Sequence, residues 1–227
     1  MSAISREEEA AFWHPLAYTL GVWLGDGSHT YNTVRRDYSI SFVSMDEEII
    51  VEVNRVLSSH FNFVNPGLYD RERTKAGTPL YRMKAYSKIL TELFCWNTDF
   101  KGKLPDFIWN APKEVQLEML AGLMDTDGTI AISGSGPKYW VLRFSGTKGF
   151  AYQVPDLCRV IGINMVGKGH VEEHLNPAHA QRLIVSIPLR SALANGFYFK
   201  CARKAERLER ARVGLKPSET ICLDAKA

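Results

Sequence analysis

Two short stretches that lie about half a chain apart constrain this sequence more than any other feature. Thr19–Gly27 reads TLGVWLGDG, and Leu120–Gly128 reads LAGLMDTDG. Each copy places apolar residues at helical spacing before an Asp-Gly pair, which is typical of a helix that ends at a carboxylate. Asp127 follows Asp26 by 101 residues (127 − 26) in a chain of 227. Asp-Gly alone is a common turn signal, but two copies with similar flanks indicate a duplicated fold.

Small residues line one side of each of these stretches. Ala17, Gly21 and Gly25 recur every fourth residue, and Gly122 and Thr126 occupy the matching places downstream. Glycines inside a surface helix only weaken it, whereas small side chains allow two helix backbones to approach closely. The pattern therefore predicts that the two motif helices pack directly together, which places their terminal aspartates side by side.

The remaining elements are expected to repeat in the same order in both halves. The first half is predicted to contain a helix from Pro15, a hairpin over 30–44, a helix over Met45–His60, a hairpin over 68–86 and a helix over Ser87–Cys95. The second half is predicted to contain helices over Gln116–Asp127, Phe150–Ile161 and Leu189–Asn195, with hairpins over 129–145 and 168–187 between them.

This order predicts an α+β fold. Two helix-strand-strand-helix-strand-strand-helix halves are related by a pseudo-two-fold axis, with the motif helices packed at the centre and two antiparallel sheets forming a saddle. The expected units are an N-terminal half over 1–109, a C-terminal half over 110–212 and a tail over 213–227, in which Ser218–Asp224 is a candidate strand.

Composition narrows the class of protein. The apolar content of 45% suits a globular core, and a formal net charge of +3 neither requires nor excludes a nucleic-acid partner. The four cysteines form no Cys-x-x-Cys pair, so neither a zinc ribbon nor a disulfide framework is indicated. There is no apolar run of the roughly 20 residues that cross a membrane, and the acidic N-terminus lacks the features of a signal peptide. We expect an intracellular protein, cytoplasmic or organellar.

The two stretches resemble the paired motifs of the LAGLIDADG homing endonucleases. The downstream copy departs from the motif only at Met124 and Thr126, and the upstream copy is the Leu-Gly-x-x-Leu-Gly-Asp-Gly variant of intein endonuclease domains. Lys103–Ile108 resembles the Lys-x-Ile-Pro-type block that precedes the second motif, so the resemblance spans roughly residues 13–212. It implies a monomeric enzyme of intein or intron homing that cuts a long asymmetric DNA duplex and leaves 3′ overhangs.

Intein origin does not imply splicing by this chain. The sequence starts with Met1 instead of a splicing nucleophile and ends in Asp224–Ala227 instead of His-Asn. We therefore expect no protein splicing.

The paired aspartates favour a metal ion between the helix ends. Two neighbouring carboxylates, each at the negative end of a helix dipole, repel each other unless a cation joins them. Hard oxygen ligands favour Mg²⁺, which also binds substrate phosphates; Mn²⁺ is expected to substitute, and Ca²⁺ to support binding without cleavage. The resemblance implies Asp26 and Asp127 as ligands, helped by the carbonyls of Gly25 and Thr126. Asp125 has no counterpart upstream and receives no role.

The resemblance also implies one basic residue beside each aspartate, near the transferred phosphate. In the first half Lys103 is the first choice, with Lys101 as the alternative. In the second half Lys204 is the first choice, with Lys200 as the alternative. Asp26, Asp127, Lys103 and Lys204 are thus the expected catalytic residues.

Polar and basic residues recur along the predicted hairpins. A two-stranded ribbon fits the major groove, where such side chains can bind base edges. The candidate DNA contacts are Arg35, Arg36, Arg71, Arg73, Arg82, Lys84, Lys138, Arg143, Lys168, His170 and Arg182.

Three other functions fit parts of the sequence. An RNA maturase that assists intron splicing and a DNA-binding regulator with an inactive centre would both keep the fold. His170–His174 matches the H-x-x-E-H pattern of a metallopeptidase. That pattern needs a helix, whereas the glycines before it and Pro177 after it favour a strand and a loop.

Overall fold

The computed structural model describes residues 6–61, 68–73, 77–133, 139–165, 170–173 and 182–213. The first half consists of α1 (Arg6–Asp26), β1 (Gly27–Asn32), β2 (Asp37–Ser44), α2 (Glu47–Phe61), β3 (Leu68–Arg73), β4 (Pro79–Tyr86) and α3 (Lys88–Asn97), followed by the 3₁₀ helix η1 (Asp106–Asn110). The second half consists of α4 (Lys113–Asp127), β5 (Gly128–Ser133), β6 (Tyr139–Thr147), α5 (Lys148–Ala151), α6 (Val154–Ile161), β7 (His170–Glu173), β8 (Arg182–Pro188), α7 (Leu189–Ala194) and α8 (Ala202–Val213). The expected duplicated α+β fold is confirmed.

Two antiparallel sheets have the same internal order. One runs β1-β2-β4-β3 and the other β5-β6-β8-β7, so the middle pair in each joins the two hairpins of a half. The registers also match: Phe42 pairs with Gly27 and Met83, and Phe144 pairs with Gly128 and Val185. This correspondence lets each position in one sheet be assigned its equivalent in the other.

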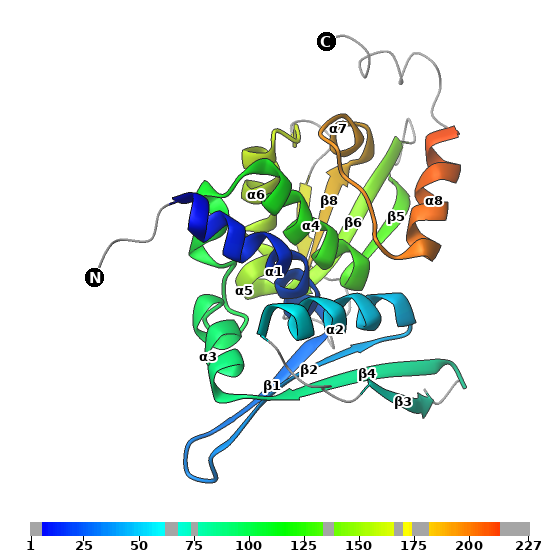
Figure 1. Ribbon diagram of the computed structural model, residues 1–227. Coiled ribbons are helices and arrows are strands. Elements are labelled where there is room, and N and C mark those ends of the chain that lie inside the picture. The colour runs from blue at the N-terminus through cyan, green and yellow to red at the C-terminus, as the bar shows by residue number, and fades with distance from the viewer. Residues whose placement is uncertain are drawn as a thin grey trace.

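The helices cover one face of each sheet and leave the opposite face open. Along β2 and β6 the residues facing the helices, such as Phe42 and Phe144, are fully buried, while their neighbours Ser41 and Arg143 are half-buried. α2 and α3 pack on the first sheet, and α5, α6 and α7 pack on the second. Figure 1 shows α1 and α4 lying against each other between the two sheets. We call the two uncovered faces the open faces.

The contact between α1 and α4 is closer than ordinary side chains allow. A Cβ atom added to Gly21 would lie 2.4 Å from the Met119 carbonyl oxygen, and one added to Gly122 would lie 2.2 Å from the Tyr18 carbonyl oxygen. Both distances are below van der Waals contact with backbone that cannot rotate away. The glycines therefore permit direct backbone packing, as their spacing predicts.

Three elements differ from the expectations. α1 begins at Arg6 and contains Pro15, which was expected in its first turn; the extra turns are held partly by Trp13, whose ring stacks on Phe107 at 4.2 Å. The helix expected over Phe150–Ile161 is split into α5 and α6, with Pro155 near the start of α6, where its missing N–H costs little.

The third difference is α8, which was not expected and lies where the sequence is dominated by charge. Its few buried side chains, Lys204, Leu208 and Ala211, are spaced on one side of an otherwise exposed helix. The candidate strand Ser218–Asp224 lies outside the described residues. Within the described part of the chain, no helix combines the length and the apolar character needed to span a membrane.

Candidate functional site

The two motif aspartates are the last residues of their helices, and a strand follows each without a loop. α1 ends at Asp26 and β1 starts at Gly27; α4 ends at Asp127 and β5 starts at Gly128. A Cβ at either glycine would lie 2.4 Å from a carbonyl oxygen of the preceding helix turn, that of Trp23 or Met124. Glycine is therefore required for the chain to leave the helix at once, and this sharp exit fixes both carboxylates at the helix ends.

Close packing of the helices brings these ends together. A Cβ at Gly25 would lie 2.0 Å from Thr126 Oγ1 and 3.4 Å from Asp127 Oδ2. Asp26 keeps contact with solvent, yet protein surrounds it on its other sides, and this burial together with the charge of Asp127 raises its pKa to about 6. Burial also raises the pKa of Asp127. The charge of Asp127 thus disfavours the ionised form of Asp26, as expected for a pair that receives a cation.

Arg182 compensates one member of this pair. Its Nη2 donates to Asp127 Oδ1 at 2.7 Å and to the Ser145 carbonyl at 2.7 Å. The ion pair opposes the effect of burial on the pKa of Asp127. Arg182 was expected as a DNA contact, but the structure places it at the carboxylate pair.

Lys101 lies at the end of α1. Its Nζ donates to the carbonyls of Gly25 and Gly27, at 3.2 and 2.9 Å. The charges of Asp127 and Asp26 raise its pKa, but burial has the larger effect and lowers the pKa to about 8. Lys103, the first choice from the sequence, is instead paired with Asp106 at 2.7 Å. The structure therefore brings the alternative, Lys101, to the aspartates and does not bring Lys103 there.

An unusual backbone turn presents Lys101. Asp99, Phe100 and Lys101 have φ values of 45°, 52° and 74°, which non-glycine residues rarely adopt. Hydrogen bonds hold the turn: the Phe100 N–H donates to the Cys95 carbonyl at 2.7 Å, and the Lys101 N–H donates to Thr98 Oγ1 at 3.3 Å. Strained backbone of this kind persists where its surroundings over-determine it and is concentrated at functional sites.

Lys204 occupies the corresponding position at the end of α4. Its Nζ donates to the carbonyls of Met124, Asp125 and Thr126, at 2.8, 2.6 and 3.0 Å. The side chain is 7% exposed, and burial lowers its pKa. An ammonium that binds the last carbonyls of a helix satisfies acceptors that have no partner within the helix and complements its dipole. The structure thus brings Lys204, the first choice for the second half, beside Thr126.

Asp125 anchors the segment that carries Lys204. Its Oδ2 accepts from Tyr18 Oη at 2.9 Å and from the N–H groups of Lys200 and Cys201, at 3.0 and 3.1 Å. The side chain is 1% exposed, and burial raises its pKa to about 6. Lys200, the alternative to Lys204, points elsewhere: its ammonium pairs with Glu118 at 2.8 Å and lies over the Tyr18 ring. No local sequence signal indicates this function for Asp125, because its partners lie far away along the chain.

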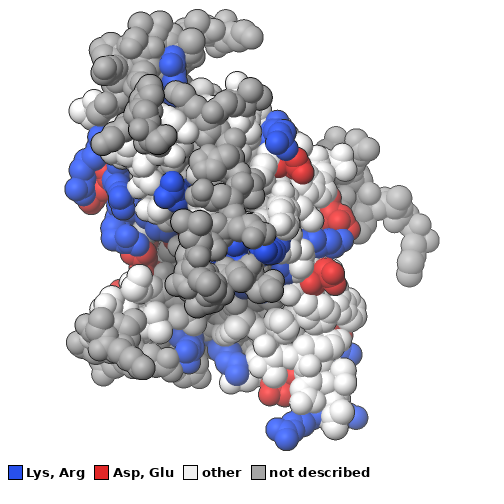
Figure 2. Space-filling model, turned by 180° about the vertical axis from the view of Figure 1, so that it is seen from behind, with Lys and Arg blue, Asp and Glu red and all other residues white. Residues whose placement is uncertain are grey.

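Several candidate DNA contacts lie on the open faces. Lys84 pairs in register with Ser41, Arg82 with Val43, and Arg143 with Thr129 and Ser186. Figure 2 shows Lys and Arg side chains near the middle of the face turned away from Figure 1. Arg35 and Arg36 are exposed between β1 and β2.

The other candidates can be placed only in part. The backbones of Arg71 and Arg73 belong to β3, and that of His170 belongs to β7. Lys138, Lys168 and His174 lie outside the described residues. Because His170–Glu173 forms a strand, it lacks the helix that the metallopeptidase pattern requires.

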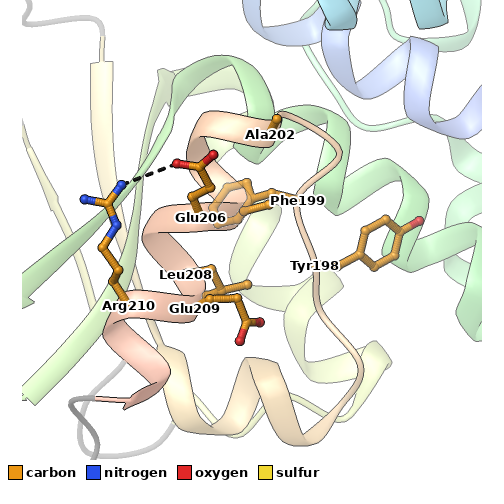
Figure 3. A pocket seen from close by; sticks show the side chains of 8 residues that line it. Tyr198, Phe199, Ala202, Glu206, Leu208, Glu209 and Arg210 are labelled. Atoms are coloured by element: carbon orange, nitrogen blue, oxygen red, sulfur yellow. Dashed lines mark hydrogen bonds and ion pairs between the residues drawn. The ribbon is translucent and has the colours of Figure 1, made fainter.

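A separate hollow lies beside α8 (Figure 3). Phe199 and Leu208 give it apolar walls, and the Glu206–Arg210 ion pair lies at its edge. Neither motif aspartate lines it. The hollow is therefore distinct from the site between the motif helices.

Solved structures with this fold include homing endonucleases. I-DmoI in complex with DNA and Ca has a TM-score of 0.58 at 18% identity, covering 88% of this chain and 98% of that one. The homing endonuclease I-WcaI bound to its DNA recognition sequence has a TM-score of 0.51 at 17% identity, covering 100% and 90%. Further I-DmoI complexes with target DNA contain Mn or Mg.

Curated relatives match only part of the chain, and no family model matches it. The ribonucleoside-diphosphate reductase NrdEB subunit alpha of Bacillus subtilis is 27% identical over 130 residues, 51% of this chain and 11% of that protein. The iron-sulfur cluster assembly SufBD family protein ML0593 of Mycobacterium leprae is 30% identical over 125 residues, 53% of this chain and 13% of that protein. The chain thus spans about an eighth or less of these relatives. Its order of elements, its paired motif helices and its structural neighbours together give it the fold of the LAGLIDADG homing endonucleases.

Proposed function

We propose that this protein is a site-specific, metal-dependent DNA endonuclease that cuts both strands of a duplex. The observation that carries the proposal is the pair of helix ends at which Asp26 and Asp127 meet, with Lys101, Lys204 and Arg182 around them. Two open faces that bear basic residues flank this centre. The neighbours that were solved with their target DNA support the same conclusion.

The donor set at the centre fits a hard divalent cation. Two carboxylates and the carbonyls of Gly25 and Thr126 offer oxygen ligands only, and the charge of Asp127 helps to raise the pKa of Asp26, as two neighbouring carboxylates do. Oxygen ligands suit Mg²⁺, and Mn²⁺ is the expected substitute. A bound cation of this kind supplies Lewis acidity and a more acidic water molecule.

The residues of the chain act around that ion. The helix ends hold the two aspartates at fixed positions, so that little reorganisation accompanies the reaction. Lys101 and Lys204, each anchored on helix-end carbonyls, place an ammonium beside each aspartate, where it can stabilise charge on a phosphate. We therefore assign the basic role in the first half to Lys101 rather than Lys103.

The open faces suit a long and asymmetric DNA site. Equivalent positions carry different side chains: Ser41 and Lys84 in the first sheet correspond to Arg143 and Ser186 in the second. Each half thus presents one basic side chain at a similar distance from the centre, from β4 in the first sheet and from β6 in the second. Because both halves lie in one chain, we propose that a monomer binds the whole site, with the scissile bonds at the minor groove and 3′ overhangs as products.

The partial matches favour an origin as an inserted element. Two relatives whose names describe unrelated activities each match about half of this chain, over 11% of the length of one and 13% of the other. A match to so small a part of proteins with unrelated activities is typical of an inserted element, so neither activity is carried over to this chain. We propose that it is an endonuclease of the kind found within inteins.

The proposal is tested by incubating the protein with a library of random duplexes and Mg²⁺ and sequencing the ends produced. A single long consensus at staggered double-strand breaks is expected. Ca²⁺ serves as the binding-only control, and binding should weaken steeply with salt because phosphate contacts dominate affinity. Specific binding without breaks would instead indicate a regulator, and failure to bind duplex DNA would reject the proposal.

Substitution of either aspartate should separate cleavage from binding. Asp127→Asn removes a charged oxygen ligand but keeps the shape of the side chain, so we expect cleavage to fall at least about a hundredfold with little change in affinity for the target. Gel shifts in Ca²⁺ and cleavage assays in Mg²⁺ measure the two quantities. The control Asp156→Asn, on the exposed surface of α6, should retain full activity; undiminished cleavage by Asp127→Asn would contradict the assignment.

A further inference from the structure

Arg182 distinguishes one aspartate from the other. Its Nη2 binds Asp127 Oδ1 and the Ser145 carbonyl, both at 2.7 Å, which fixes one oxygen of that carboxylate against β6. Asp127 Oδ2 remains directed to the other helix, 3.4 Å from the position of a Cβ at Gly25. The Nε atom of Arg182 is buried and has no hydrogen-bond partner among the described residues. The arginine thus orients Asp127 while part of its donor capacity stays unused.

In the described part of the first half, the position that matches Arg182 carries no arginine. In the matched registers, Phe42 corresponds to Phe144 and Met83 corresponds to Val185. Arg182 lies three residues before Val185, so its counterpart is the residue three positions before Met83. That residue is Leu80, which cannot form an ion pair. The charged groups that influence the pKa of Asp26 are Asp127, which raises it, and Lys204, Lys101 and Arg182, which lower it.

We propose that Arg182 is a positioning residue of the Asp127 centre alone, so that cutting of one DNA strand depends on it and cutting of the other does not. The inference rests on the proposed function. Its physical basis is that a carboxylate held by a short hydrogen bond from an arginine that is itself anchored on the Ser145 carbonyl loses less orientational freedom when it acts, whereas no such contact to Asp26 is present among the described residues. A second consequence follows from charge, because a guanidinium at 2.7 Å from a ligand oxygen opposes the approach of a divalent cation.

The test compares both strands in one duplex. The target carries a different fluorophore on each strand, and single-turnover rates in Mg²⁺ are measured for the unaltered protein, Arg182→Leu and Arg182→Lys. We expect Arg182→Leu to slow one strand by at least about tenfold more than the other, so that nicked DNA accumulates, and Arg182→Lys to restore part of that rate. Arg159→Leu, which removes an exposed arginine from α6, is the matched control and should leave both rates unchanged.

A loss of folding would lower the rates of cutting of both strands in the same proportion and leave their ratio unchanged. The ratio therefore distinguishes a loss of folding from the expected effect of Arg182. Equal slowing of both strands, or no slowing at all, would overturn the inference while leaving the proposed endonuclease intact. Absence of cutting by the unaltered protein would reject the proposed function itself.

Binding of Mn²⁺ tests the inference independently of DNA cleavage. In Mn²⁺ titrations followed by electron paramagnetic resonance, Arg182→Leu should bind Mn²⁺ several-fold more tightly, because a competing positive charge has been removed. Equal or weaker Mn²⁺ binding would contradict the action of Arg182 on Asp127.

Discussion

At the scale of single residues, the placement of Lys204 depends on Asp125. The carboxylate accepts three hydrogen bonds at one oxygen, Oδ2, from Tyr18 and from two backbone N–H groups just before α8. Its other oxygen, Oδ1, is buried and has no partner among the described residues. Asp125 therefore joins α1, α4 and the segment that leads to Lys204 through a single atom.

This geometry predicts that two substitutions of Asp125 differ in their effect on the free energy of unfolding. Asn keeps an oxygen at the Oδ2 position and removes a buried charge, so Asp125→Asn should change the free energy of unfolding by only about 1 kcal/mol. Asp125→Ala leaves three buried donors unpaired and should cost at least about 2 kcal/mol. Denaturant unfolding measures both values, and an Asn variant as unstable as the Ala variant would contradict the single-oxygen account.

At the scale of elements, the two motif helices form the axis of the molecule. Their backbones touch at Gly21 and Gly122. The Cα atom of each glycine lies 3.0 Å from the position that a Cβ on the other glycine would occupy. The same contact sets the distance between Asp26 and Asp127 at the helix ends. Stability and function therefore depend on the same stripe of small residues.

Widening this contact should damage both properties. In Gly122→Ala, the new methyl group would lie 2.2 Å from the Tyr18 carbonyl oxygen, so the helices must separate. We expect a loss of at least about 2 kcal/mol in the free energy of unfolding, despite the higher helix propensity of alanine, and a loss of cleavage. Thermal unfolding and cleavage assays check this, with Glu114→Ala on the exposed side of α4 as the control; a stabilised Gly122→Ala would show that the helices are not in backbone contact.

At the scale of the whole molecule, ion pairs join the two halves away from the motif helices. Arg203 in α8 binds Asp46, just before α2, through two hydrogen bonds of 3.0 and 2.8 Å. The Ala202 N–H donates to Glu48 in the same region. Because α8 also carries Lys204, these contacts connect the outer surface of the first half to the end of α4 in the second.

The Asp46–Arg203 pair predicts how stability depends on pH. Hydrogen bonds from Arg203 lower the pKa of Asp46 against the opposing effect of burial. A lowered pKa in the folded state means that this stabilisation is complete above the ordinary value of about 3.8 and disappears as the pH falls through the lowered value. Asp46→Asn should thus lose about 1 kcal/mol or less at pH 7, after solvent screening, and the difference should shrink in acid.

Unfolding curves of the two proteins between pH 7 and pH 3 measure this dependence. Asp156→Asn, which breaks an ion pair between exposed side chains within α6, is the control and should show a smaller effect. A difference that grows toward low pH would contradict the assignment.

The sequence by itself determined the duplication, the order of the main elements and the two aspartates. Hydrophobic periodicity, small-residue stripes and Asp-Gly helix ends are local signals, because each depends on residues within a few turns of one another. They predicted the packing of α1 on α4 through Gly21 and Gly122, which the structure confirms. The candidate DNA contacts on the hairpins remain predictions, since no bound nucleic acid tests them.

Tertiary structure alone decided which charged residues surround the aspartates. The choice between Lys101 and Lys103 depends on left-handed backbone at Asp99, Phe100 and Lys101, none of which is a glycine that would indicate it in the sequence. Arg182 reaches Asp127 across the sheet, and Asp125 binds a segment 75 residues away. Long charged side chains can point in many directions at similar local energy, so their partners are set by the contacts that folding brings together and not by neighbours in sequence.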